Sequence, residues 1–178
     1  QDTLQARING YLQLNGNKYP AQAIHRIDYE TSGLVLFCKH PFFQAYCDKN
    51  MEEHHIKKDY IALVQGHTNY KNKKIVSNIA RDRHNAKKMI IHPNGKESIS
   101  IFNTLKNYKD YSLIQVTILT GRKHQIRVQC ASLKHPILND SLYGGKRIDN
   151  TGLLLQSHHI QFNDIDVICP QEKRFIRK

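Results

Sequence analysis

The chain has 178 residues, an apolar fraction of 39% and a net charge of +12, with a pI near 9.6. This apolar content excludes a disordered chain, and no apolar run approaches the ~20 residues of a membrane helix. The charge favours a polyanionic partner over a membrane surface, because no basic amphipathic helix is visible. We expect free thiols and a cytoplasmic location, because the four cysteines form no CxxC pair and are scattered at Cys38, Cys47, Cys130 and Cys169.

Half of the net charge lies in one stretch, residues 67–97. It holds eight Lys or Arg residues against Asp82 and Glu97, which gives +6 of the total of +12. A solvated surface face is the simplest reading of any run of charge. The clustering favours a surface that contacts phosphates, with Arg83, Lys87 and Lys88 as candidate contacts.

The first predicted element is a short helix within residues 1–19. Its apolar residues recur at helical spacing, and Asn15-Gly16-Asn17 then breaks the pattern. A second helix is expected from Pro41 to about Glu53, because proline is favoured at a first helical position. Its inner face is predicted to carry Phe42, Phe43, Ala45 and Tyr46.

The segment HRIDYETSGLVLF, residues 25–37, joins a polar loop to an apolar, β-favouring run. The run from Gly33 to Phe37 is long enough for a buried strand. Asp28 would then place a carboxylate close to the core, where it needs partners. The plain alternative is that Asp28 only closes an Asx-type turn.

The remaining predicted elements alternate strands with one helix. Two of these elements contain Tyr60 and Arg127. The simplest expectation for Tyr60 is a half-buried tyrosine with its hydroxyl at the surface, and for Arg127 an ordinary arginine on the surface of a helix. Turns are expected at 82–85 and 93–95, and the segment HPNGKE reads as a hairpin turn. The expected elements are strands at 57–66, 111–119 and 153–162, hairpin arms at 87–92 and 98–104, and a helix at 124–133.

Three stretches together resemble one protein family. HRIDYETSGLVLFCK is similar to the HRLDxxTSGLLLxAK motif of RluA-type pseudouridine synthases, and KKDYIALVQG is similar to their KxYxAxVxG motif. LTGRKHQIRVQCASLKHPILNDSLYGG resembles their TGRxHQIRVHxAxxGHPIxGDxxYG motif, in which Asp140 and Tyr143 are among the matched positions. The likeness extends over nearly the whole chain, from about Thr3.

The resemblance implies roles for individual residues. Asp28 corresponds to the catalytic nucleophile, Tyr60 to the tyrosine that lies against the target base, and Arg127 to the arginine that pairs with the catalytic Asp. Arginine suits that task because it stays charged and can pair with a carboxylate bidentately. The residues expected to bind RNA are Arg26, Arg83, Lys87, Lys88, Arg122 and His124.

The chain departs from the family pattern at several points. Gln129 replaces a histidine, and Lys134 and Asn139 each replace a glycine. Loss of glycine can alter a turn, since lysine tolerates positive φ poorly. The strand that precedes the first helix in the family has no counterpart in this sequence, so we expect the chain to begin inside the domain and to lack one sheet strand.

We therefore expect a single α+β catalytic domain, residues 1–178, with a mixed, mainly antiparallel central sheet flanked by helices. The expected function is isomerisation of a uridine to pseudouridine in rRNA or tRNA, by a monomer that needs no metal and no organic cofactor. One alternative is a catalytically inactive RNA-binding module of the same fold. Another is a His-rich metal-dependent hydrolase, but the adjacent residues His54 and His55 do not face one another on a helix and lack partners at ligand spacing.

Overall fold

The computed structural model describes residues 2–176, which form two compact units. The N-terminal unit comprises the described residues up to Ile27 together with Val35–Ile56. The sheet unit comprises Asp28–Leu34 and the described residues from Lys57 onward. Among residues 2–176, no helix is both long and apolar enough to cross a membrane.

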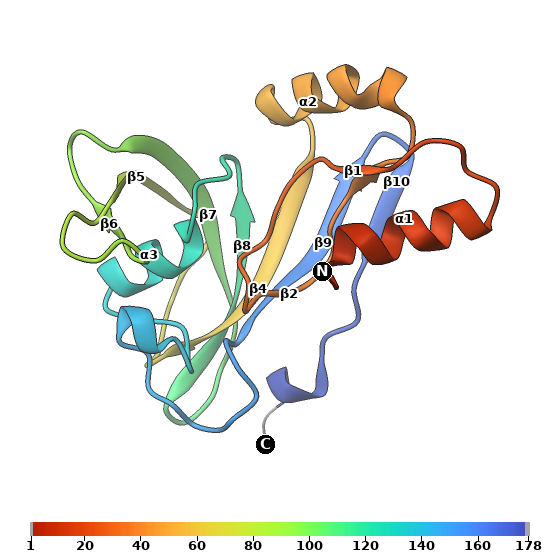
Figure 1. Cartoon of the computed structure of the whole chain (residues 1–178). Coiled ribbons are helices and arrows are strands. Elements are labelled where there is room, and N and C mark those ends of the chain that lie inside the picture. The colour runs from red at the N-terminus through yellow and green to blue at the C-terminus, as the bar shows by residue number, and fades with distance from the viewer. Residues whose placement is uncertain (1, 177–178) are drawn as a thin grey trace. The chain divides into compact units, whose positions relative to one another are not determined.

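The N-terminal unit contains both helices that the sequence predicts in its range (Figure 1). The Thr3 side chain accepts a hydrogen bond from the Ala6 N–H and so satisfies a free donor at the start of the first helix. A two-stranded antiparallel ribbon, β1 with β3, completes the unit. The bounds are α1 Leu4–Leu14, β1 Gln22–Ala23, β3 Phe37–Cys38, the 3-10 turn Pro41–Phe43 and α2 Gln44–Glu52.

The predicted inner face of α2 is wrong. Phe42, Phe43 and Tyr46 are 80%, 55% and 50% exposed. The buried residues of α2 are Cys47 and Asn50. The helix begins only at Gln44, after a 3-10 turn, so its angular phase differs from that of a helix begun at Pro41.

The expected buried strand at 33–37 is also wrong. Ser32 and Gly33 form the two-residue strand β2 (Ser32–Gly33), which pairs with the sheet, whereas β3 pairs with β1. Gly33 is exposed, and the following residues up to Phe37 are only partly buried. The apolar run is divided between the two units, so neither unit buries it as one strand.

The sheet unit contains one eight-stranded sheet of order β10-β9-β4-β8-β7-β5-β6, with β2 beside β9. Every pairing is antiparallel except β2 with β9. The expected α+β class with a mixed, mainly antiparallel sheet is confirmed. The strands are β4 Lys57–Gln65, β5 Lys73–Arg81, β6 Met89–Ile91, β7 Lys96–Asn107, β8 Tyr111–Ile118, β9 Leu155–Phe162 and β10 Ile165–Ile168.

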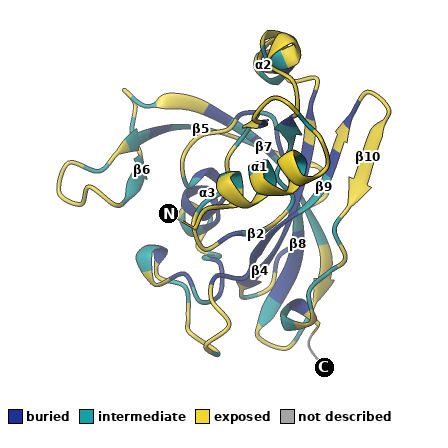
Figure 2. Ribbon diagram, turned by 45° about the vertical axis from the view of Figure 1, so that its right-hand side comes forward, coloured by how far each residue is buried: buried dark blue, intermediate teal, exposed yellow. Residues whose placement is uncertain are grey.

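The core of this unit follows the central strands. Figure 2 shows β4 and β8 largely buried, whereas the edge strand β10 is exposed. Ile61, Leu63 and Ile114 are at most 3% exposed. The helix α3 (Gln125–Ser132) packs on the β5–β6 side of the sheet and buries Ile126 and Val128. Apolar burial of this kind contributes roughly 25 cal/mol per Å².

The turn at 93–95 forms as predicted, but its two arms do not pair with each other. Both β6 and β7 pair with β5 instead. A Cβ atom on Gly95 would lie 2.6 Å from the carbonyl carbon of Ile79, so the turn passes directly against the backbone of β5. Only glycine permits this approach, and the hydrogen-bonding edges of β5 are shared between both arms.

The C-terminal end of α3 keeps the backbone that glycine would favour, although the residue is Lys134. Its φ is +64°, its N–H donates to the carbonyl of Ala131, and the next N–H, from His135, donates to Cys130. This is the Schellman arrangement, in which glycine usually occupies the left-handed position. The substitution has therefore left the turn intact. Asn139 is likewise left-handed, with φ of +65°, which asparagine tolerates.

We predict that Lys134→Gly raises the free energy of unfolding by roughly 0.5–1 kcal/mol, because it removes the steric cost of a Cβ atom in the left-handed region. Urea unfolding with an unchanged m value measures this. Lys134→Ala is the matched control, since it removes the charged side chain but keeps the Cβ. A gain in Lys134→Ala equal to that in Lys134→Gly would assign the effect to charge rather than to backbone strain.

Candidate active site

Asp28 opens the turn that leads into β2. The Thr31 N–H donates a 3.0 Å hydrogen bond to the backbone carbonyl of Asp28, so the turn is closed by the main chain and not by the Asp28 carboxylate. Gly33 has φ of +102°, and a Cβ there would lie 2.1 Å from the Ser157 carbonyl oxygen. The Leu34 N–H donates to that oxygen at 3.0 Å. Glycine at this position therefore allows the loop to pair with β9. The Asp28 side chain is 17% exposed, so solvent or a ligand can reach it.

Arg127, on α3, is buried and not a surface residue: it is only 4% exposed. Its Nε–H donates to Asp140 Oδ2 at 2.8 Å, and Nη2 donates to Asp140 Oδ1 at 2.7 Å. This is a bidentate ion pair, and the Asp140 side chain has no exposed surface. Burial alone lowers the pKa of Arg127, but the hydrogen bonds and charge of Asp140, with the charges of Asp28 and Glu30, raise it above its ordinary value.

Two further carboxylates surround the same guanidinium. Nη1 of Arg127 lies 3.9 Å from Asp28 Oδ2, and Nη2 lies 3.8 Å from Glu30 Oε2. The structure thus brings Asp28 and Arg127 to ion-pair distance, across about a hundred residues of sequence. The expected bidentate pairing is formed with Asp140, however, because this carboxylate already occupies the Nε and Nη2 side of the guanidinium.

Tyr143 packs beside this cluster, in the 3-10 turn Ser141–Tyr143. Its ring centre lies 5.1 Å from Cζ of Arg127, within cation–π range. Its hydroxyl accepts a 2.8 Å hydrogen bond from the Met89 N–H and lies 2.8 Å from His124 Nδ1. Sequence reasoning matched Asp140 and Tyr143 to the family motif but gave neither a role. Their presence in one short segment after the helix that carries Arg127 is the signal that could have found them.

Tyr60 lies on β4, between Val116 of β8 and Ser157 of β9. It is 5% exposed, so the reading of a half-buried tyrosine with its hydroxyl at the surface does not hold. Burial raises the pKa of Tyr60 to about 12, and the negative charge of Asp28 adds to the effect. The phenol is therefore neutral at neutral pH, and it lies in the electrostatic field of Asp28.

The candidate RNA-binding residues lie in several places. Arg83, Lys87 and Lys88 belong to the basic turn, residues 82–88, which links β5 to β6. Asp82 Oδ1 accepts hydrogen bonds from the N–H groups of residues 84 and 85, which shapes this turn. Lys88 Nζ lies 5.6 Å from the centre of the Tyr143 ring.

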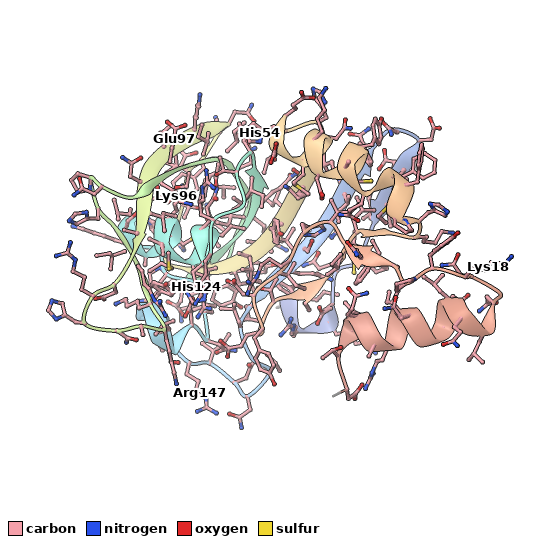
Figure 3. All side chains as sticks on the ribbon, turned by 45° about the horizontal axis from the view of Figure 1, so that its top comes forward. Lys18, His54, Lys96, Glu97, His124 and Arg147 are labelled. Carbon is pink, nitrogen blue, oxygen red and sulfur yellow. The ribbon has the colours of Figure 1, made fainter. Side chains whose placement is uncertain are left out.

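The other three candidates are Arg122, His124 and Arg26. Arg122 is exposed, and its Nε–H donates to the Glu97 carbonyl at 2.9 Å. His124 lies directly before the first residue of α3 (Figure 3). Its backbone is left-handed, with φ of +54°. Burial lowers the pKa of His124. Arg26 is exposed and belongs to the N-terminal unit.

Residues 2–176 contain no group of three or more His, Cys, Asp or Glu side chains that could hold a metal ion. His54 and His55, which gave rise to the metal hypothesis, are both exposed. The metal-dependent hydrolase therefore gains no support from any donor set within the described part of the chain. The carboxylates that surround the Arg127 guanidinium form the candidate active site.

We predict that Arg127→Met costs about 3–5 kcal/mol of unfolding free energy, because it leaves the carboxylate of Asp140 buried without its partner. The double variant Arg127→Met/Asp140→Asn should be clearly less destabilised than the sum of the two single changes. Denaturant unfolding of the four proteins measures the coupling. A second cycle, with Asp28→Asn in place of Asp140→Asn, should give a smaller coupling because Asp28 is farther away and partly exposed. Equal couplings would contradict the view that Asp140 is the main partner of Arg127.

A sequence model of the RNA pseudouridylate synthase family matches residues 2–132, which include Asp28, Tyr60 and Arg127. The chain is 38% identical over 170 residues to the uncharacterized RNA pseudouridine synthase YhcT of Bacillus subtilis, covering 94% of this chain and 55% of that protein. It is 34% identical over 170 residues to the ribosomal large subunit pseudouridine synthase D of Borreliella burgdorferi, covering 93% of this chain and 51% of that protein.

Solved structures share the fold. Human RNA pseudouridylate synthase domain containing 1 has a TM-score of 0.78 and 24% identity, over 93% of this chain and 75% of that one. Human RNA pseudouridylate synthase domain containing 4 has a TM-score of 0.77 and 16% identity, over 97% and 79%. The chain spans about half the length of the curated relatives named above. From the matched motifs and the fold that carries them, the chain belongs to the RNA pseudouridylate synthase family.

Proposed function

We propose that this chain isomerises a uridine to pseudouridine in structured RNA, with Asp28 as the catalytic nucleophile. The observation that carries the proposal is the position of the Asp28 carboxylate, 3.9 Å from the buried guanidinium of Arg127. Asp28 begins the turn that leads into β2, and β2 pairs with β9. A carboxylate with a fixed positive neighbour stays ionised in a site that substrate closes to water. Relatives named as ribosomal large subunit enzymes favour rRNA as the substrate class over tRNA.

The reaction breaks the bond between N1 of uracil and C1′ of the ribose, turns the base, and joins C5 to C1′. The hydrogen displaced from C5 is balanced by one gained at N1, so no cofactor is consumed. An ionised Asp28 can act covalently or accept a proton in such a sequence. Three starting steps are open to it: attack on the base, attack on the sugar, or removal of a sugar proton.

Tyr60 and the basic residues have supporting roles in the proposal. We assign to Tyr60 the role of the tyrosine against the target base, and the negative charge of Asp28 is one of the causes that raise its pKa. The target uridine must leave its stack to reach Asp28, which a basic surface facilitates by holding the flanking phosphates. The basic turn 82–88 is the proposed phosphate contact within the sheet unit. A single domain, a monomeric state and a cytoplasmic location stay predictions.

We predict that Asp28→Asn abolishes pseudouridine formation but leaves the Kd for RNA within a few-fold, because the side chain is nearly isosteric and affinity comes mostly from phosphate contacts. Pseudouridine is mapped by its mass shift after chemical labelling of RNA treated with each protein. Asp110→Asn, a substitution at an exposed turn, is the matched control. Turnover by Asp28→Asn at the wild-type rate would remove Asp28 from its role. RNA binding without any pseudouridine from the wild-type chain would favour the inactive binding module.

RNA affinity should fall steeply with salt, and Lys87→Ala should make the slope of log Kd against log salt shallower by up to about one unit. Lys109→Ala is the control. Lys109 follows the end of β7 that lies opposite the basic turn, and a strand of this length spans about 35 Å. Fluorescence anisotropy across a salt series measures both slopes. Affinity independent of salt, or equal slopes for the two variants, would contradict the basic-turn surface.

A further inference from the structure

Tyr143 connects three segments of the sheet unit through one buried side chain. It is 8% exposed. Its hydroxyl contacts the Met89 backbone and His124 Nδ1, and its ring lies over Arg127. Burial lowers the pKa of His124. The hydroxyl accepts from the Met89 N–H and lies within hydrogen-bond distance of His124 Nδ1, and these two contacts together hold the ring in place.

Met89 is the residue through which the basic turn reaches this ring. It is the first residue of β6 and follows the turn 82–88 directly. The Lys88 ammonium also lies over the Tyr143 ring, 5.6 Å from its centre. Two cations, one on the turn and one at the candidate active site, therefore share one aromatic ring.

Phosphate binding at the turn would disturb this arrangement in a defined way. A phosphate competes with the ring for the Lys88 ammonium, because a charge-assisted hydrogen bond is stronger than the ring contact. A displacement of the turn that moves Met89 also acts on the Tyr143 hydroxyl, because the Met89 N–H donates to it. Arg127 is held on one side by Asp140, so movement of the ring acts on the side of the guanidinium that faces Asp28.

We propose that Tyr143 is a positioning residue that transmits RNA binding at the basic turn 82–88 to the guanidinium of Arg127. The inference rests on the proposed function in that RNA is the ligand. It goes further by assigning to Tyr143, and to the backbone N–H of Met89, the link between the phosphate-contacting surface and the pair formed by Arg127 and Asp28. Tyr143 itself touches neither phosphate nor the reacting atoms in this scheme.

The decisive readout is the Nε–Hε NMR signal of Arg127, identified by its absence in Arg127→Lys. Short oligocytidylate serves as the probe, because it supplies RNA phosphates but no uridine to react. We expect the probe to shift this signal in the wild-type protein. In Tyr143→Phe, which keeps the ring but loses the hydroxyl, the shift should fall by at least half while the Kd for the probe stays within about twofold.

Tyr70→Phe is the matched control. It removes another buried tyrosine hydroxyl of the sheet unit, from a ring that packs on Phe102, and should leave the shift unchanged. Lys88→Ala provides a second route that leaves the core intact, since Lys88 lies at the surface turn. It should reduce the shift as well. An unchanged shift in both Tyr143→Phe and Lys88→Ala, no shift in the wild type on binding, or a loss of affinity in Tyr143→Phe as large as the loss of shift would each overturn the proposal.

Turnover separates this inference from the proposed function. With uridine-containing RNA, Tyr143→Phe should lower kcat about tenfold with KM within twofold, because small errors in the placement of catalytic groups are costly. Tyr143→Leu, which removes the ring as well, should lower kcat further. Wild-type activity that Tyr143→Phe retains in full overturns the inference alone. A wild-type chain that shifts the Arg127 signal on binding but forms no pseudouridine overturns the proposed function alone.

Discussion

The buried guanidinium of Arg127 is the constraint on which the candidate site depends. A charge in that position is tolerated only with a partner in good geometry, and Asp140 supplies one that is itself fully buried. Once Asp140 binds Nε and Nη2, the orientation of the guanidinium is fixed and Nη1 is left toward Asp28. Asp28 and the ring of Tyr143 both lie beside the guanidinium that is held in this way.

Local backbone features position both Asp28 and Asp140 beside the Arg127 guanidinium. Gly33 allows the loop to approach the Ser157 carbonyl, and the parallel pairing of β2 with β9 then fixes the residues that precede it. On the other side, the left-handed backbone at Lys134 and Asn139 preserves the path from α3 to Asp140 although both family glycines are absent. Asn139 also binds its own loop, since its amide donates to Asp149 and to the Gly152 carbonyl. The backbone at Lys134 and Asn139 is thus in the left-handed region that glycine favours, although neither residue is glycine.

The sequence was most informative where periodicity is long. The strands at 57–66, 111–119 and 153–162 and the helix at 124–133 all form close to their predicted bounds, because alternation or helical spacing is sustained there. The sequence did not predict which strands pair. Both arms of the turn at 93–95 pair with β5 and not with each other. This pairing depends on the close approach of Gly95 to the backbone of β5, which no local sequence pattern indicates. The predicted inner face of α2 was wrong because the first residue of the helix, Gln44, decides which side chains point inward.

The same limit applies to the site. The family motifs indicated Asp28, Tyr60 and Arg127, and the fold brings Asp28 and Arg127 to ion-pair distance. The main partner of Arg127 could not be read from residue types, because Asp28, Glu30 and Asp140 are all carboxylates within reach of it. Only the return of the loop after α3 decides that Asp140 takes the bidentate position. Tyr60 is similar: strand alternation places it on one face, but its burial depends on the neighbours β8 and β9.

If Asp28 is the nucleophile as proposed, Asp140 acts on the reaction only by holding the Arg127 guanidinium beside it. The most direct test of this claim is a double-mutant cycle on kcat/KM for pseudouridine formation, using the wild type, Asp140→Asn, Arg127→Lys and the double variant. We expect Asp140→Asn alone to lower kcat/KM substantially, and its addition to Arg127→Lys to lower kcat/KM little further. Full activity in Asp140→Asn, or strictly multiplicative losses in the double variant, would show that Asp140 does not act through Arg127.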